Sequence, residues 1–440
     1  MSDVKKTKVI GYLPDDTPPL WKLIFFALQQ MVVMFPATVL VALLTGFHVS
    51  TTIFASGLAT LGFILVTKGR IPLYYGSSFS YIAAIVAMTG VKQFGEVASD
   101  LAISQAQCGI IASGLVSILA GFIINRFGRN QVEKVLPPVV TGSVAIVIGI
   151  ALAGTAMSGA ASNWTVSLVT LLATILFSVY LRGTLGQLPI LFGVVAGYLV
   201  SIGLGLVDFT KVTGAPLVTV PHFTFPVWSP AAILAIMPIA IATIPESTAH
   251  LYQIDLYVNN LAKKLGRKKE YSISGLLGTN LIGDGLGDMI AGCIGGPAGT
   301  NYGENNSVMA ITRNFSVPVL ILSACIAIGL SFFGKLAGAV NTIPGAVIGG
   351  VSVYLFGVIG VQGVALMISE KVDFFSAKTL AVASTILVIG IGGSFAFPNG
   401  MIPIFGVNLP AIATAAVFGI VLNLIFNIFP VSQEAAASEK

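Results

Sequence analysis

Long apolar segments separated by short polar turns run from Trp21 to Phe429. A helix needs about 20 consecutive apolar residues to cross roughly 30 Å of hydrocarbon. By this measure the sequence predicts an all-α polytopic membrane protein with fourteen spans. They lie at residues 21–45, 51–67, 71–89, 102–124, 138–157, 164–181, 188–207, 230–257, 274–294, 296–311, 316–333, 344–368, 377–395 and 408–429. The third and tenth spans begin with an extended piece rich in Gly, Pro, Ser and Thr, so neither is expected to be a simple helix.

Composition supports the membrane class. Of the 440 residues, 55% are hydrophobic and only 9% are charged, and the mean hydropathy is +0.95. Soluble domains carry about 25% charged residues. Residues 1–440 are therefore expected to form one integral membrane domain, which also interacts with lipid. The net charge of +5 does not imply nucleic-acid binding, because basic residues of a membrane protein mostly set its orientation.

The basic residues predict the orientation of the spans. The first nineteen residues lack the apolar stretch of a signal peptide and are expected to form a cytoplasmic tail. With that start, all but three of the 22 Lys and Arg fall on cytoplasmic tails, turns or helix ends, the exceptions being Lys92, Lys211 and Lys335. This bias predicts an even number of spans in the cell inner membrane, with both termini cytoplasmic.

Seven plus seven spans with both ends on one side is the arrangement of an inverted repeat. Under that repeat, Pro36 in span one corresponds to Pro245 in span eight, and residues 75–79 in span three correspond to 301–305 in span ten. Paired interruptions of this kind indicate a transporter's binding site. The alternative for a lone proline such as Pro36 is a kink that neighbouring helices tolerate.

Two carboxylates, Glu246 and Glu304, lie inside these apolar segments, and each follows a helix-breaking residue. An ionisable group at the bilayer centre costs roughly 2.5 to 3.5 kcal/mol on insertion scales, so such groups usually serve function. Because an apolar environment disfavours the charged form, at least one carboxyl is expected to hold a proton near neutral pH. His250, four residues after Glu246, could share this role, although a lone histidine can also be satisfied by backbone.

The interrupted spans also predict what could bind. Helices that begin within the membrane expose backbone N–H groups after Gly76 and near Gly303. With the carboxylates, these donors would suit a planar heterocycle that alternates C=O and N–H groups, and Phe79 or Tyr302 could stack on it.

Two further acids, Asp284 and Asp288, are one helical turn apart near the expected start of span nine. Helix capping with partial hydration is the favoured role for this pair.

Motifs of catalysis are absent from the sequence, which has no phosphate-binding loop, no His-Glu-x-x-His and no nucleophile elbow. Its three cysteines lack metal-ligand spacing. We therefore expect no enzyme activity, no cofactor and no metal.

The run Thr300-Asn301-Tyr302-Gly303-Glu304-Asn305, followed by 308–313, resembles the signature of the nucleobase-ascorbate (NCS2) transporters. Residues 69–79, 245–250 and 349–360 also resemble the bacterial uracil permeases of that family. The resemblance extends over nearly the whole chain.

The resemblance implies a 7+7 inverted repeat with short antiparallel strands in spans three and ten. It also implies a core domain (20–126 and 230–338) that moves past a gate domain (137–207 and 342–430) in an elevator-like mechanism, with proton symport and a homodimer formed through the gate.

The resemblance further implies roles for individual residues. Glu246 and Glu304 would bind the base and, with His250, couple it to protons. The remaining substrate-binding positions would be Ala37, Ser78, Phe79, Tyr302, Gly303 and, from the gate, Ser352. Glu followed by His four residues later in span eight favours uracil, and xanthine or another purine is the alternative.

Some positions depart from the family pattern, namely Gln30, Pro36, Ser307 and Phe356. They affect the expected shape of the pocket more than the class of protein. An inorganic-anion exchanger would instead be expected to have a cationic or neutral pocket, and a passive channel would not accumulate its substrate.

Overall fold

The computed structural model describes residues 11–128, 134–183, 185–404 and 407–429, and most of them are helical. Within these ranges, eight helices have the length and apolar composition needed to cross a bilayer, and four further apolar helices are shorter. The protein is therefore a multi-pass membrane protein. A helix occurs in each of the predicted spans, but the number of crossings and the inverted repeat remain predictions.

The first group of helices packs around α2, α4, α13 and α15, with α1 against α15. It comes from two separate parts of the chain. Its N-terminal elements are α1 (Leu20–Thr45), α2 (Val49–Val66), β1 (Tyr75–Ser77), η1 (Phe79–Tyr81), α3 (Ile82–Thr89) and α4 (Asp100–Phe127). Its later elements are α11 (Pro230–Ile236), η3 (Met237–Ile239), α12 (Ala240–Lys264), η4 (Ser274–Leu276), α13 (Leu277–Ile294), β2 (Gly299–Asn301), α14 (Gly303–Thr312), α15 (Val317–Ser331) and α16 (Gly334–Val340).

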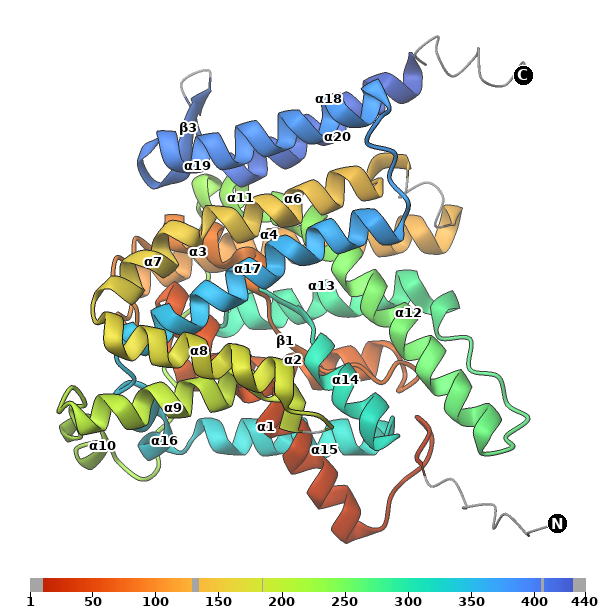
Figure 1. Cartoon of the computed structure of the whole chain (residues 1–440). Coiled ribbons are helices and arrows are strands. Elements are labelled where there is room, and N and C mark those ends of the chain that lie inside the picture. The colour runs from red at the N-terminus through yellow and green to blue at the C-terminus, as the bar shows by residue number, and fades with distance from the viewer. Residues whose placement is uncertain (1–10, 129–133, 184, 405–406, 430–440) are drawn as a thin grey trace.

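The second group packs around α17, which contacts α6, α7 and α8, while α18 lies beside α20 at the top of Figure 1. Between the two stretches of chain that form the first group, the second group contributes α6 (Pro138–Ala151), α7 (Ala153–Ala161), α8 (Trp164–Tyr180), η2 (Leu185–Gln187) and α9 (Pro189–Gly203). The short helix α10 (Thr210–Thr213) follows and packs against α16 of the first group. Its C-terminal elements are α17 (Gly345–Ser369), α18 (Ala377–Leu387), η5 (Val388–Gly392), α19 (Gly393–Ala396), η6 (Pro398–Gly400), β3 (Met401–Ile404), β4 (Val407–Pro410) and α20 (Ala411–Ile428).

Glycines set the closest helix contacts. A Cβ atom added to Gly114 of α4 would lie 2.5 Å from the carbonyl oxygen of Gly285 in α13, and one added to Gly121 would lie 2.5 Å from the carbonyl oxygen of Gly278. The α6–α17 pair repeats this arrangement, since a Cβ on Gly363 would lie 2.5 Å from a carbonyl oxygen of α6. Small residues let membrane helices pack backbone against backbone, where a hydrophobic driving force between helices is lacking.

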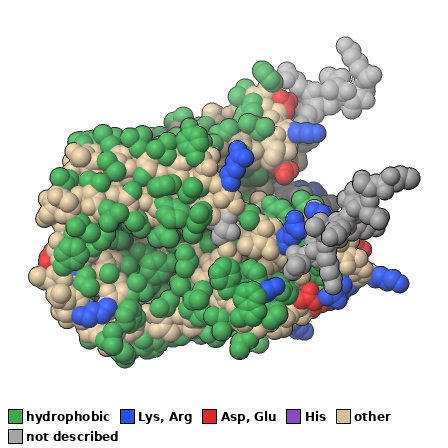
Figure 2. Space-filling model, turned by 60° about the horizontal axis from the view of Figure 1, so that its bottom comes forward, with side chains coloured by type: hydrophobic (Ala, Val, Ile, Leu, Met, Phe, Trp, Pro, Cys, Tyr) green, Lys and Arg blue, Asp and Glu red, His purple; other side chains and the backbone are tan. Residues whose placement is uncertain are grey.

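The surface divides as expected for a protein in a bilayer. Figure 2 shows apolar side chains covering the body of the molecule, while most charged side chains gather at one end. Both ends of the described chain lie toward that end (right in Figure 1), the N-terminal end on the side of the turn after α12 and the C-terminal end at the end of α20. There Arg267 pairs with Asp16 at 2.8 Å and Lys269 pairs with Asp15.

Two expectations about interruptions are wrong. Pro36 and Pro245 lie inside the continuous helices α1 and α12 and do not break them, because neighbouring helices can compensate for one lost hydrogen bond. The break in span eight lies earlier, at the 3₁₀ turn η3. The β3–β4 hairpin near the end of the chain was not predicted.

Substitution of Gly114 tests the α4–α13 contact. We expect Gly114→Ala to lower the midpoint of thermal unfolding in detergent, because overpacking of a tight contact costs about 1–3 kcal/mol. Gly329→Ala in α15 is the matched control, since a Cβ there meets nothing within 4 Å. Equal stability of the two variants would contradict the importance of the contact.

Candidate functional site

A two-stranded sheet joins the two irregular spans of the first helix group. Strands β1 and β2 are antiparallel, with Tyr75 opposite Asn301 and Ser77 opposite Gly299. The pairing continues on both sides, because the Tyr302 N–H donates to the Tyr74 carbonyl (2.9 Å) and the Ser78 N–H donates to the Ala298 carbonyl (3.1 Å). These are the strands that the family resemblance implied, and the structure confirms them.

Side chains of α2 and α13 satisfy the groups at the margins of this small sheet. The Ser56 hydroxyl donates to the Tyr75 carbonyl at 2.8 Å, and Thr60 accepts from the Tyr75 N–H at 3.1 Å. Asp288 accepts from the Tyr75 hydroxyl (2.6 Å) and from the Gly299 N–H (2.7 Å). Unpaired backbone groups are costly where water is absent, so these contacts allow an open sheet to exist inside the protein.

A helix begins directly after each strand. Phe79, half-buried, starts η1, which leads into α3, and the buried Ser78 accepts from the Ser80 N–H at 3.2 Å. Gly303 starts α14, and Glu304 lies in its first turn. The first N–H groups of a helix have no acceptor within it, so two sets of donors meet at the sheet.

The two predicted carboxylates meet at this place. Glu246, on α12, accepts a hydrogen bond from the Ser80 hydroxyl at 3.4 Å. Its carboxyl group lies close enough to that of Glu304 for an electrostatic interaction. Both glutamates are partly buried. The structure therefore brings both acids to the start of the two interrupted helices, as the sequence predicted.

His250 and Tyr302 pack against the glycines of the same motifs. The His250 Nε2 atom lies 2.8 Å from the position that a Cβ of Gly303 would occupy. The Tyr302 ring covers Gly76 and leaves no room for a side chain there. Its hydroxyl is 2.8 Å from the Thr38 hydroxyl of α1. Only glycine fits at these two positions, which explains two of the glycines in the sequence motifs.

For the other predicted site residues, the structure gives their burial and their hydrogen bonds. Ala37, next to Thr38, is buried in α1. Ser352 lies in α17 of the second group, and its buried hydroxyl has no hydrogen-bond partner among the described residues. Gln30, one of the departures from the family pattern, accepts from the Asn305 amide at 2.7 Å and so links α1 to α14. Sequence reasoning missed this link and the Ser80 contact, although both residues stand next to the quoted motifs.

A buried polar cluster supports the site from behind. Ser247, next to Glu246, donates to Asp284 and accepts from Asn280 at 2.7 Å and from Asn301 at 3.2 Å. Asp284 and Asp288 are 6% and 2% exposed and lie well inside α13. The expectation of a partly hydrated cap at the start of span nine is therefore wrong, because both acids are held by hydrogen bonds in the interior.

A cavity of about 250 Å³ lies between the two helix groups, beside α12. Pro245, Thr248 and Tyr252 line it from α12, opposite Thr141 of α6 and Glu370 after α17. Pro245 directly precedes Glu246 in the chain, but neither Glu246 nor Glu304 is among the residues that line the cavity. The cavity is a space at the boundary between the two helix groups.

These features define the chemistry available. Carboxylates accept N–H groups, free amides at helix starts bind C=O groups, and Tyr302 adds an aromatic ring. A planar polar ring satisfies such a set of partners better than a simple anion, which two carboxylates would repel.

Comparison with known proteins agrees with this arrangement. The chain is 40% identical to the uracil permease of Bacillus caldolyticus over 428 residues, covering 93% of each protein. It is 36% identical to the uracil permease of Escherichia coli, covering 94% of each, and 36% identical to that of Bacillus subtilis, covering 96% of each.

Solved structures share the fold at low identity. The transmembrane domain of the cyanobacterial bicarbonate transporter BicA matches with a TM-score of 0.55 at 14% identity, covering 94% of this chain and all of that domain. Murine Slc26a9, an anion transporter solved in the inward-facing state, matches with a TM-score of 0.63 at 12% identity, covering 98% of this chain and 73% of that one. The fold is thus that of membrane transporters.

The profile described as the Permease family matches residues 21–399, most of the chain. Together with the curated relatives, this match shows that the chain belongs to that permease family, the NCS2 nucleobase-ascorbate transporters that its motifs resemble.

Proposed function

We propose that this protein imports uracil across the cell inner membrane together with protons. The observation that carries the proposal is the meeting of Glu246 and Glu304 with two helix starts beside the β1–β2 sheet. The relatives named uracil permeases favour uracil as the substrate.

Each edge of the uracil ring has a candidate partner. Glu246 and Glu304 accept from ring N–H groups, and the backbone amides of Phe79 and Gly303 donate to ring carbonyls. Ala37, Ser78 and Tyr302 line the site from the first helix group, and Ser352 approaches from the second. The unpartnered, buried hydroxyl of Ser352 supports this assignment, because a ligand would supply the hydrogen bond that it lacks.

The same carboxylates provide the proton coupling. Carboxyl groups inside the membrane serve as proton carriers in transporters, so one of Glu246 and Glu304 can hold the coupled proton. His250 packs on Gly303, the residue before Glu304, and can pass or share this proton. The protonated acid can donate its O–H to a ring carbonyl while the other acid accepts a ring N–H, so proton and substrate favour each other's binding, as symport requires.

Movement occurs between the two helix groups, an elevator-like displacement of the core (20–126 and 230–338) past the gate (137–207 and 342–430). The cavity at their boundary supports this division, since the groups are loosely packed there. Both termini are cytoplasmic, and lipid surrounds the apolar surface. The protein forms a homodimer through the gate, and native mass spectrometry in nanodiscs measures the mass of this dimer.

Replacing either carboxylate tests the site. We expect Glu246→Gln and Glu304→Gln to lower uracil binding and uptake roughly 10- to 100-fold, because a hydrogen bond to a charged group is worth about 1.5–3 kcal/mol. Radiolabelled uracil uptake into proteoliposomes measures this loss. Glu270→Gln, in an exposed turn, is the control and should transport normally. Full activity of Glu304→Gln would contradict the assignment.

A pH gradient tests the coupling. Proteoliposomes with an acidic exterior and an alkaline interior should accumulate uracil above its external concentration, and a protonophore should abolish the accumulation. Uptake that does not depend on the pH gradient would exclude proton symport, and equilibration without saturation would indicate a channel.

Substrate preference can be measured in the same uptake assay. Unlabelled uracil should compete with labelled uracil at a lower concentration than xanthine does; the reverse order would indicate a purine carrier.

A further inference from the structure

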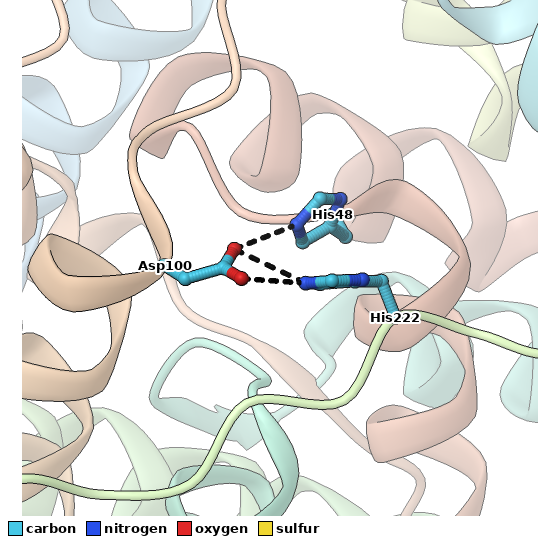
Figure 3. A group of neighbouring side chains, drawn as sticks. All are labelled: His48, Asp100 and His222. Atoms are coloured by element: carbon cyan, nitrogen blue, oxygen red, sulfur yellow. Dashed lines mark hydrogen bonds and ion pairs between the residues drawn. The ribbon is translucent and has the colours of Figure 1, made fainter.

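A cluster of three potential metal ligands consists of residues that are not among the predicted transport-site residues. His48 precedes α2, Asp100 begins α4, and His222 lies in the extended segment before α11. Their ligand atoms all lie within 4.8 Å of one another. Figure 3 shows both imidazole rings pointing a nitrogen toward the Asp100 carboxylate.

The present contacts leave one of these nitrogens without a partner. The His222 Nε2 atom lies 3.0 and 3.1 Å from the two oxygens of Asp100. The His48 Nε2 atom is 3.9 Å from the nearer oxygen and has no hydrogen-bond partner in the described part of the chain, although it is shielded from solvent. The two rings lie 4.4 Å apart between centroids. A gap bordered by two nitrogens and a carboxylate is thus present.

Hydrogen bonds hold the segment that carries His222 in position. The Thr51 hydroxyl of α2 donates to the His222 carbonyl at 2.6 Å. Two residues further on, the Gln107 amide of α4 donates to the Thr224 carbonyl at 2.8 Å and accepts from the Thr224 hydroxyl at 2.8 Å. The extended segment is therefore fixed against α2 at residue 222 and against α4 at residue 224. Hydrogen bonds that fix the position of a ligand favour metal binding.

We propose that His48, Asp100 and His222 bind one divalent transition-metal ion of the zinc type. In a tetrahedral site with bonds of about 2.0–2.1 Å, ligand atoms lie roughly 3.3 Å apart, so only His48 has to move closer. Two imidazoles with one carboxylate suit zinc, copper or nickel rather than magnesium or calcium, which prefer oxygen ligands alone. Asp100 is exposed, which leaves the fourth position open to water.

An imidazole binds a metal in its neutral form, through the ring nitrogen that carries no proton. The bound ion would tie the extended segment to the starts of α2 and α4, outside the machinery proposed for transport.

Titration of the full-length protein, free of any histidine tag and held in nanodiscs, tests the proposal. Zinc chloride should bind at one saturable site in calorimetry and raise the midpoint of thermal unfolding, whereas magnesium chloride should do neither. His48→Ala and His222→Ala should each weaken zinc binding about 100-fold, because each removes one of three ligands. Cobalt(II) should give the visible absorption bands of a four-coordinate ion in the wild type only.

Two further variants keep the test decisive. Asp100→Asn preserves size and hydrogen bonding, so it should fold normally yet bind zinc weakly. Glu96→Gln changes another exposed acid near the same end and should bind zinc like the wild type. Wild-type protein without saturable zinc binding, or zinc binding by His48→Ala and His222→Ala that equals binding by the wild type, would show that the cluster is only a histidine–aspartate hydrogen bond and would overturn the proposal.

Discussion

The arrangement of this protein depends on backbone hydrogen bonding between β1 and β2. Two chain segments that leave helical geometry in the interior of a membrane protein must find partners for their N–H and C=O groups. Here they find them mainly in each other, and Ser56, Thr60 and Asp288 supply the rest. Because the strands are short and a helix begins directly after each of them, the starts of η1 and α14 lie close together.

That pairing also explains why the acids lie where they do. Glu304 follows β2 by three residues and has to lie in the first turn of α14, while Ser80, three residues after β1, reaches Glu246 on α12. The glycines at 76 and 303 make room for Tyr302 and His250 at the same place. One sheet thus fixes the relative positions of groups contributed by three separate parts of the chain.

Much of this could be predicted from the sequence, because polar residues in apolar segments are conspicuous. Glu246, Glu304 and the irregular segments at residues 75–79 and 301–305 stood out for that reason. The prediction that Pro36 and Pro245 interrupt their helices was wrong, because both prolines lie within continuous helices. Asp284 was misplaced because its partner Ser247 lies 37 residues away in the sequence.

Contacts between segments far apart in the sequence could not be predicted from local sequence patterns. The Gln30–Asn305 pair joins residues 275 positions apart. His48, Asp100 and His222 belong to three segments that lie far apart in the sequence, and α2 and α4 both pack against α13. The expectation of no metal rested on sequence spacing alone. Local periodicity carries no information about which turns meet at one end of a helix bundle.

The hydrogen bonds around β1 have a mechanical consequence. Ser56 and Thr60 fasten the strand to α2, and Asp288 fastens both strands to α13, which in turn meets α4 backbone to backbone. Any displacement of the carboxylate pair must carry these helices along as one piece. A change of shape would then occur at surfaces without such hydrogen bonds. The linkers that join the two helix groups would act as its hinges.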